Sequence, residues 1–280
     1  MGWNFLRCLL LFFFPLFIIG CRKDDDKIIT PIIPITNASI ENQAPVLKKV
    51  TLQINNAIGG YYGGIPYHYD QTTKSYPLLI FLHGLGQMGN GSTELDYLGI
   101  DGIGKFIVEK KLSPNFSVNG QNYSFIILSP QYSKQPTPEE VISFMEHAKQ
   151  TYRIDTTRIY LSGLSIGGVV TTEVAAKYPD KIAAIAPIAG VMKGNIKTKC
   201  SKIAKGNLPV WAFHNEKDPM IKPSDSKEFV TIVNSYAPTI AAKLTIFPNY
   251  GHDAWTEALD FKNRENGLNI YEWMLQYSRK

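Results

Sequence analysis

The chain has 280 residues, of which 44% are hydrophobic and 19% are charged. This length and composition are typical of one globular domain with a sizeable core, and they exclude a disordered or fibrous protein. The formal net charge is +5, and it falls by one, to +4, if Arg7 is removed with an N-terminal leader. Such a small excess of positive charge does not indicate a partner among nucleic acids.

The first twenty residues have the pattern of an export signal. Arg7 precedes an apolar run over residues 9–19, which is too short to span a bilayer comfortably. The run ends in Ile18-Ile19-Gly20-Cys21, which resembles the lipobox of bacterial lipoprotein signals, where the chain is cut before a lipidated cysteine. We therefore predict a signal peptide over residues 1–20, lipidation of Cys21, and a protein exported and anchored to the bacterial cell envelope, at the outer membrane or cell surface. An uncleaved membrane anchor or an ordinary signal peptide is the alternative.

Residues 21–45 differ in composition from the rest of the chain. They contain Pro31, Pro34 and Pro45 among scattered polar residues and show no sustained helical or strand period. This predicts a flexible tether that leads to one folded domain over residues 46–280. Once the leader is removed and Cys21 is acylated, Cys200 is the remaining thiol, so no disulfide is expected within the mature chain.

Strand and helix patterns alternate through the domain. From Val46, alternating apolar residues and a glycine-rich turn predict an antiparallel hairpin. Helices are predicted from the capping box at Thr137, from about Asp225, and over residues 268–277. Six short apolar runs predict strands buried on both faces, at 78–82, 125–128, 159–161, 182–188, 210–213 and 244–247. This order predicts an α/β fold with a mostly parallel central sheet, the N-terminal antiparallel hairpin, helices on both faces and no large lid.

One pentapeptide, Gly163-Leu164-Ser165-Ile166-Gly167, has the form GxSxG. A chain of this length contains such a match by chance about 0.1 times. Here, however, the motif follows the apolar run at 159–161 and precedes a helical pattern that Pro179 ends. A strand, a sharp turn and a helix are what a nucleophilic serine on a strained turn requires, so Ser165 is the candidate nucleophile. The alternative is a glycine-rich turn without chemistry.

A serine nucleophile needs a histidine to take its proton, and the histidine needs a carboxylate to orient it. In this arrangement the acid and then the histidine follow the serine in sequence. His252 comes after the last predicted strand and is the candidate base. His214 is expected to shape the loop that presents the acid, whereas the remaining histidines are expected to be structural; these are His68, His83 and His147.

The candidate acids follow the predicted strand at 210–213. Asp218 is favoured because it stands in a loop before Pro219, from which its carboxylate can reach the histidine. Glu216 is the main rival, and Asp225 is a remote third because it should begin a helix. The choice between Asp218 and Glu216 stays open on the sequence.

An oxyanion also needs hydrogen-bond donors. The backbone N–H of Ile166, at the start of the helix after Ser165, is one candidate. The N–H of Leu85 in the loop after the strand at 78–82 is the other, with His83 ordering that loop.

From about residue 77 to 278, the chain resembles the esterase and "predicted peptidase" group of α/β-hydrolases, which includes bacterial carbohydrate esterases. The resemblance rests on five motifs in order: Leu82-His83-Gly84-Leu85-Gly86, Leu128-Ser129-Pro130-Gln131, Gly163-Leu164-Ser165-Ile166-Gly167-Gly168, the segment 210–219, and Gly251-His252-Asp253-Ala254-Trp255. It implies a serine carboxylesterase in which Ser165, Asp218 and His252 form the triad and Trp255 lines the substrate pocket. It implies no cofactor, and no metal-binding spacing is present.

The chain departs from the family's usual motif at one place, and the resemblance suggests several possible functions. Relatives often carry Gly-Glu-Arg-Gly after the oxyanion loop, whereas this chain has Gly86-Gln87-Met88-Gly89, so any substrate group held by that charged pair is in doubt. The expected substrates are acetyl or feruloyl esters of polysaccharides; a prolyl-oligopeptidase-like peptidase and a non-catalytic binding lipoprotein are the alternatives. A loop is expected after the strand at 182–188, and it contains Lys193, Lys197, Lys199, Lys202 and Lys205. The two interpretations of these lysines are that they attract acidic substrates or that they are an ordinary solvated surface. Oligomeric state is not indicated.

Overall fold

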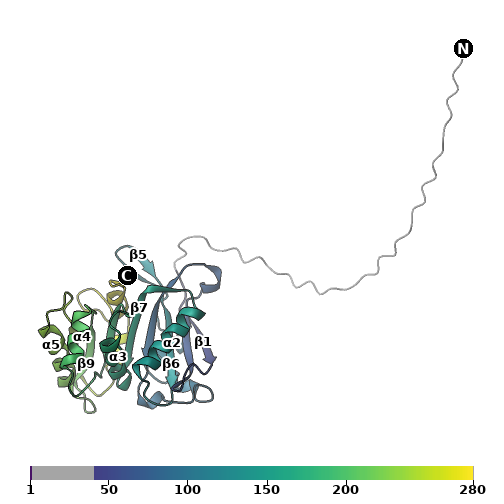
Figure 1. Ribbon diagram of the computed structural model, residues 1–280. Helices are drawn as coiled ribbons and strands as arrows, with labels where there is room; N and C mark the ends of the chain where they lie inside the picture. The colour runs from purple at the N-terminus through teal and green to yellow at the C-terminus, as the bar shows by residue number, and fades with distance from the viewer. Residues whose placement is uncertain (2–40, 280) are drawn as a thin grey trace. The chain divides into compact units, whose positions relative to one another are not determined.

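The computed structural model describes Met1 and residues 41–279 (Figure 1). The expected signal peptide, Cys21 and most of the expected tether lie outside the described residues. Packing extends to Glu41, five residues before the expected boundary at Val46: its side chain is buried, and its carboxylate accepts a hydrogen bond of 2.9 Å from the backbone N–H of His68. No helix in the described part of the chain is long and apolar enough to cross a membrane.

Eight strands form one mixed sheet in the order β1-β2-β6-β3-β7-β8-β9-β10. Strand β2 pairs antiparallel with both β1 and β6, whereas the neighbours from β6 to β10 run parallel. The predicted hairpin and mostly parallel sheet are therefore confirmed. In chain order the strands are β1 Val46–Thr51, β2 Ile58–Ile65, β3 Tyr76–Leu82, β6 Ile126–Tyr132, β7 Ile154–Leu164, β8 Ala184–Ile188, β9 Trp211–Lys217 and β10 Lys243–Tyr250.

Two apolar cores lie on the two faces of the sheet, because successive side chains of a strand point to opposite faces. In β3, Leu78 and Ile80 belong to one core, and Leu79 and Phe81 belong to the other. The first core is covered by α2 Pro138–Thr151, α3 Ile166–Lys177, α4 Lys197–Lys205 and α5 Pro223–Ser235, which Figure 1 shows in front of the strands. The second is covered by α1 Gly102–Val108, α6 Trp255–Leu259 and α7 Ile270–Leu275. Helices thus cover both faces, as predicted.

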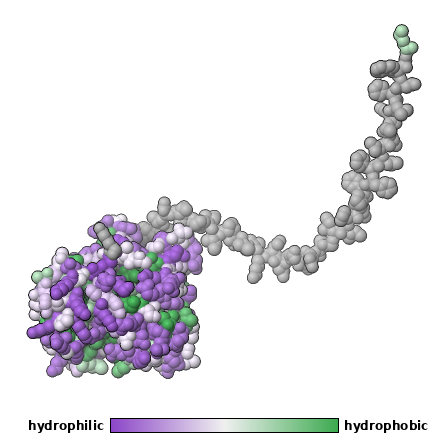
Figure 2. All heavy atoms as spheres, in the orientation of Figure 1, coloured by the Kyte–Doolittle hydropathy of each residue, from purple (hydrophilic) through white to green (hydrophobic). Residues whose placement is uncertain are grey.

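The predicted capping box of α2 is present. The Thr137 hydroxyl accepts a hydrogen bond from the Glu140 N–H at 3.2 Å, and the Glu140 carboxylate accepts one from the Thr137 N–H at 2.8 Å. Polar residues cover most of the outer surface over α2 to α5, where apolar residues form only small, separate areas (Figure 2). The apolar sides of these helices are accordingly turned toward the sheet.

The long connection between β3 and β6 contains elements that the apolar pattern did not predict. They are short 3₁₀-helices at Leu85–Gln87 and Leu95–Gly99, helix α1, and a hairpin of β4 Phe116–Val118 and β5 Gln121–Tyr123; a further 3₁₀-helix, Tyr69–Gln71, precedes β3. Phe116 stacks on Tyr271 of α7 with ring centroids 4.7 Å apart. The connection therefore packs onto the body of the domain.

The lysine-rich segment was expected to be a loop, and that expectation is wrong for most of it, because Lys197–Lys205 is helix α4. Cys200, Ile203 and Ala204 are buried at helical spacing, so apolar contacts with the domain stabilise a helix despite the lysines. Lys193 forms an ion pair with Asp225 at 2.8 Å, and Lys199 forms one with Glu173 at 2.7 Å. Those two charges are already paired within the protein.

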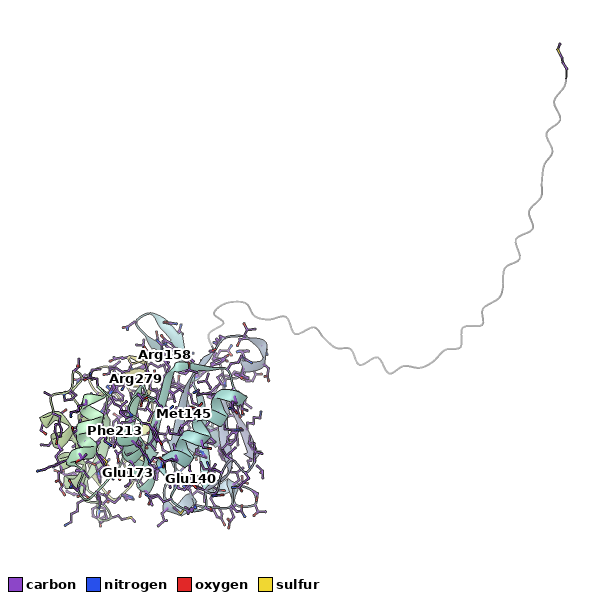
Figure 3. The ribbon with its side chains drawn as sticks, viewed as in Figure 1. Glu140, Met145, Arg158, Glu173, Phe213 and Arg279 are labelled. Atoms are coloured by element: carbon purple, nitrogen blue, oxygen red, sulfur yellow. The ribbon has the colours of Figure 1, made fainter. Side chains whose placement is uncertain are left out.

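The direction of the strands places the carboxyl ends of the parallel strands at one end of the domain. In Figure 3, Arg158, early in β7, lies near Arg279 at one end, and Glu140, at the start of α2, lies at the other. Strand β7 runs from Arg158 toward Ser165, so Ser165 lies toward the Glu140 end. Catalytic residues in open α/β sheets are found at this end.

Candidate active site

Ser165 stands on a strained turn between β7, which ends at Leu164, and α3, which begins at Ile166. Its φ of 54° and ψ of −118° lie in a region that residues other than glycine rarely occupy. A Cβ on Gly163 would lie 2.6 Å from the carbonyl carbon of Gly167, and a Cβ on Gly167 would lie 2.1 Å from the carbonyl oxygen of Leu82. Only glycine fits at both positions, and the turn holds the serine above the end of the strand.

The structure brings Ser165, His252 and Asp218 together from three separate segments. The Ser165 hydroxyl oxygen lies 2.9 Å from His252 Nε2, and His252 Nδ1 lies 2.6 Å from Asp218 Oδ2. The carboxylate accepts a hydrogen bond from the Nδ1–H group, which leaves the Nε2 lone pair free to accept the hydroxyl proton. The arrangement can therefore activate the serine as a nucleophile.

Asp218 is the acid that the structure places at the histidine. Its side chain is fully buried, and its Oδ1 accepts hydrogen bonds from the N–H groups of Met220 and Ile221 at 2.8 and 3.0 Å. Burial alone would raise the pKa of this carboxyl, but the hydrogen bonds from His252, Ile221 and Met220 outweigh burial and lower it. Glu216 is exposed on β9 instead.

A second histidine also touches Asp218. His214, on β9, is fully buried, and its Nε2 lies 3.1 Å from Asp218 Oδ2 and 3.0 Å from the carbonyl oxygen of Ile221. Its Nδ1 lies 2.8 Å from the hydroxyl of Ser226 on α5. Desolvation lowers the pKa of His214, so the ring is neutral. It shapes the acid loop by direct contact with the acid itself.

The two expected oxyanion donors belong to the starts of two helical segments. Ile166 is the first residue of α3 and Leu85 the first of a 3₁₀-helix, where backbone N–H groups lack partners within the helix. The 3₁₀-helix is held by Gln87, whose buried side-chain carbonyl accepts from the Gly84 N–H at 3.3 Å and whose amide donates to the Leu98 and Asp101 carbonyls at 3.1 Å.

Gln87 is a structural residue that the sequence reasoning missed. It occupies the point of departure from Gly-Glu-Arg-Gly, and its side chain is directed into the protein and not toward a substrate. A sequence signal existed, since Gln87 stands three residues after the N-cap residue Gly84, which is the position of the glutamine in a capping box.

His83 orders the same loop and cannot serve as a base. Its Nδ1 donates to the Gly84 carbonyl at 2.7 Å, its Nε2 accepts from the Tyr132 N–H at 3.1 Å, and its ring stacks on that of Tyr132 with centroids 3.6 Å apart. Burial lowers the pKa of His83 to about 3. Both nitrogens are occupied, as expected for a loop-ordering residue.

Trp255 packs against the ring of His252. Its ring meets that of His252 edge to face with centroids 5.2 Å apart, and its indole N–H donates to Asp101 Oδ1 at 2.6 Å. The side chain is only 6% exposed. It therefore offers little open surface for the pocket wall that was expected of it.

The loops that carry the site also expose large apolar side chains. Leu85 in the oxyanion loop is 67% exposed, Met220 in the acid loop is 74% exposed, and Tyr250 next to the histidine loop is 78% exposed. Apolar substrate groups would therefore meet favourable surface on these loops.

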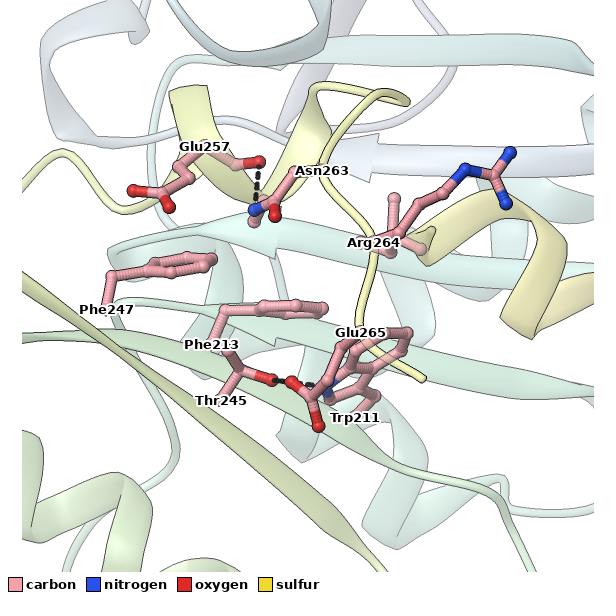
Figure 4. A pocket seen from close by; sticks show the side chains of 10 residues that line it. Trp211, Phe213, Thr245, Phe247, Glu257, Asn263, Arg264 and Glu265 are labelled. Carbon is pink, nitrogen blue, oxygen red and sulfur yellow. Dashed lines mark hydrogen bonds between the residues drawn. The ribbon is translucent and has the colours of Figure 1, made fainter. Parts of the chain in front are cut away.

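A separate hollow of about 210 Å³ lies against β9, β10 and α6 and contains none of the three residues Ser165, Asp218 and His252 (Figure 4). Its aromatic floor of Trp211, Phe213 and Phe247 is buried, and two of its charged groups are paired: Arg264 with Glu272 on α7, and Glu265 with Lys243. Across residues 41–279, no three His, Cys, Asp or Glu side chains are grouped so that they could hold a metal ion.

Residues 69–263 match the phospholipase/carboxylesterase family, and the chain belongs to that family of α/β-hydrolase-fold enzymes. It is 32% identical over 116 residues to poly(3-hydroxyalkanoate) depolymerase C of Paucimonas lemoignei, a match that covers 41% of this chain and 28% of the relative. It is 28% identical over 184 residues to the bifunctional acetylxylan esterase/xylanase XynS20E of Neocallimastix patriciarum, covering 62% and 24%. The matches thus span about a quarter of each curated relative. A thermostable esterase of known structure has a TM-score of 0.58 at 20% identity, covering 86% of this chain and 64% of the other, and this likeness shows the α/β-hydrolase fold.

Proposed function

We propose that the protein is a serine carboxylesterase that acts through an acyl-enzyme. The observation that carries the proposal is the pair of contacts at His252, 2.9 Å to the Ser165 hydroxyl and 2.6 Å to Asp218. His252 Nε2 takes the hydroxyl proton while the serine oxygen attacks the ester carbonyl carbon. The same proton then passes to the leaving alcohol, the carbon–oxygen bond of the ester breaks, and the acyl group stays on Ser165. Water, activated by His252 in the same way, releases the acid.

Negative charge develops on the carbonyl oxygen during both attacks. The N–H groups of Leu85 and Ile166 are the proposed donors to this oxygen, since Ile166 begins α3 directly after Ser165 and Leu85 begins a 3₁₀-helix next to Gly84, where an added Cβ would lie 3.7 Å from Ser165. Gln87 and His83 hold the first of these loops by hydrogen bonds to the backbone of Gly84. These hydrogen bonds support the proposal that the donors are held in position before the substrate arrives.

For the substrate we propose acetyl or feruloyl esters of polysaccharides. The acetylxylan esterase named above supports this class, although the chain spans only about a quarter of that relative. The exposed apolar side chains of Leu85, Met220 and Tyr250 are suited to an acyl group or an aromatic ring.

The test compares wild type with Ser165→Ala, using Ser235→Ala as the matched control because Ser235 is exposed at the far end of α5. Wild type and Ser235→Ala should label with a fluorophosphonate and hydrolyse p-nitrophenyl acetate. Ser165→Ala should not label and should lose at least about 10³-fold in kcat. Equal labelling of all three proteins would refute the proposal.

Substrate class is tested separately on acetylated xylan, feruloylated xylan and peptide amides. Release of acetate or ferulate, at rates above those on the amides, is the expected result. Turnover of the amides without turnover of the esters would replace the esterase with a serine peptidase.

A further inference from the structure

We propose that His214 is a positioning residue for Asp218, donating a hydrogen bond from its Nε2–H to the carboxylate oxygen that also contacts His252. This inference rests on the proposed function, because it assigns a second histidine to the same triad. The ring of His214 makes its hydrogen bonds to Asp218, Ile221 and Ser226, and none to Ser165. It acts through the acid.

The hydrogen bonds around Asp218 show what His214 adds. Oδ1 is held by two backbone donors, the N–H groups of Met220 and Ile221. Oδ2 faces His252 at 2.6 Å and His214 at 3.1 Å. Without His214, the oxygen that faces the catalytic histidine would be held by that histidine alone, and the carboxylate could move with it.

The neighbours of His214 determine its tautomer. Nε2 lies within 3.1 Å of two groups that can only accept, Asp218 Oδ2 and the Ile221 carbonyl, so Nε2 carries the proton and shares it between them. Nδ1 then accepts a hydrogen bond from the Ser226 hydroxyl at 2.8 Å. Ser226 is buried in the first turns of α5, so this helix fixes the orientation of the ring.

The charges around the acid explain the use of a neutral donor. His252 becomes positively charged when it takes the serine proton, and a second positive charge on Oδ2 would oppose that step. Burial keeps His214 uncharged, and α5 presents the Ser226 hydroxyl to it, while the neighbouring Asp225 is paired with Lys193. A neutral donor therefore steadies the carboxylate without adding charge beside the base.

The chain offers a matched set of variants. In His214→Gln the amide nitrogen reaches the place of Nε2, so a donor to Asp218 is retained. In His214→Asn the shorter amide reaches only the place of Nδ1, so the donor is lost. His147→Asn is the control for the same substitution on α2, where the histidine contacts Thr151 and lies outside the triad.

We expect His214→Asn in the full chain to lower kcat on p-nitrophenyl acetate by about tenfold with little change in KM, since a hydrogen bond to a charged group is lost. The acidic limb of the profile of kcat against pH should move to higher pH by about half a unit. The reason is that a carboxylate with one hydrogen-bond donor fewer attracts the proton on His252 more strongly. The downfield proton NMR signal of the His252–Asp218 hydrogen bond should shift. His214→Gln should recover part of each effect, and His147→Asn should show none.

The proposal is overturned if folded His214→Asn has the kcat, pH profile and NMR signal of His147→Asn. It is also overturned if His214→Gln and His214→Asn lose activity equally without a change in pH profile, which is the result of a purely structural role. If His214→Asn does not fold, Ser226→Ala decides: Nδ1 then loses the hydrogen bond that fixes the orientation of the ring, the Nε2–H donor is held less firmly against Asp218, and kcat should fall with a pH-profile shift in the same direction. An unchanged pH profile in Ser226→Ala would refute the proposal.

Failure of the proposed function gives a different result. A wild type that neither reacts with a fluorophosphonate nor hydrolyses esters would refute the proposed function, while the NMR signal of the His252–Asp218 hydrogen bond would still test the effect of His214 on Asp218.

Discussion

Asp218 and Glu216 are two carboxylates two positions apart, and burial gives them different environments. Asp218 is enclosed by two backbone N–H groups and two histidines, whereas Glu216 remains on the exposed end of β9. A buried carboxylate with several donors stays ionised and fixed in place, which is what orientation of a base requires.

Asp218→Asn should therefore lower kcat by about 10⁴-fold, because the amide can present a donor to His252 Nδ1 and favour the wrong tautomer. Glu216→Gln should stay within about twofold of wild type. Both variants are to be compared by kcat on p-nitrophenyl acetate at pH 8. The reverse order of effects would assign the acid to Glu216.

At the scale of elements, the turn between β7 and α3 depends on close backbone contacts. The Cβ that an alanine would place at Gly163 lies 2.6 Å from the backbone of Gly167 and 2.7 Å from that of Leu82. Strand β3, strand β7 and helix α3 converge there, so no flexible side chain can yield to make room. The strained φ of Ser165 is maintained by this surrounding packing.

Gly163→Ala should consequently lose about 1 to 3 kcal/mol of unfolding free energy in urea denaturation. Gly86→Ala is the control, because a Cβ at Gly86 would meet no atom within 4 Å. Equal stability of the two variants would show that the turn relaxes more easily than the contacts indicate.

At the scale of the whole molecule, two buried neutral histidines make stability depend on pH. Burial lowers the pKa of His83 to about 3 and also lowers that of His214. Between pH 6.5 and pH 3 the unfolded chain binds a proton at His83 that the folded chain does not bind, so stability falls as pH falls through this range. Asp218 affects stability in a more acidic range. Because its pKa is lowered in the folded protein, the ionised carboxylate stabilises the fold above about pH 4, and this contribution is lost as the pH falls further.

The expected result is a lower urea midpoint at pH 5 than at pH 8. His83 alone accounts for about 2 kcal/mol of that difference. Urea titrations at pH 8, 6.5 and 5, followed by tryptophan fluorescence, provide the measurement. Equal or greater stability at pH 5 would mean that His83 becomes protonated in the folded protein.

Local sequence determined the elements with strong periodic or steric signals. The apolar runs predicted the strands, the capping box predicted α2, and the glycines around Ser165 predicted the turn between β7 and α3, because each signal acts over a few neighbouring residues. The sequence also predicted the order of serine, acid and histidine along the chain, with the acid left open between Asp218 and Glu216.

Tertiary structure decided what depends on residues distant in sequence. It brought Asp218 and not Glu216 to His252, turned His214 onto Asp218, and directed Gln87 inward to the backbone carbonyls of Leu98 and Asp101, which precede α1. It also made α4 a helix, because Cys200, Ile203 and Ala204 are stabilised only where the rest of the domain buries them. Local patterns specify backbone conformation, whereas hydrogen bonds and burial between separate segments specify which of several chemically similar side chains reaches the site.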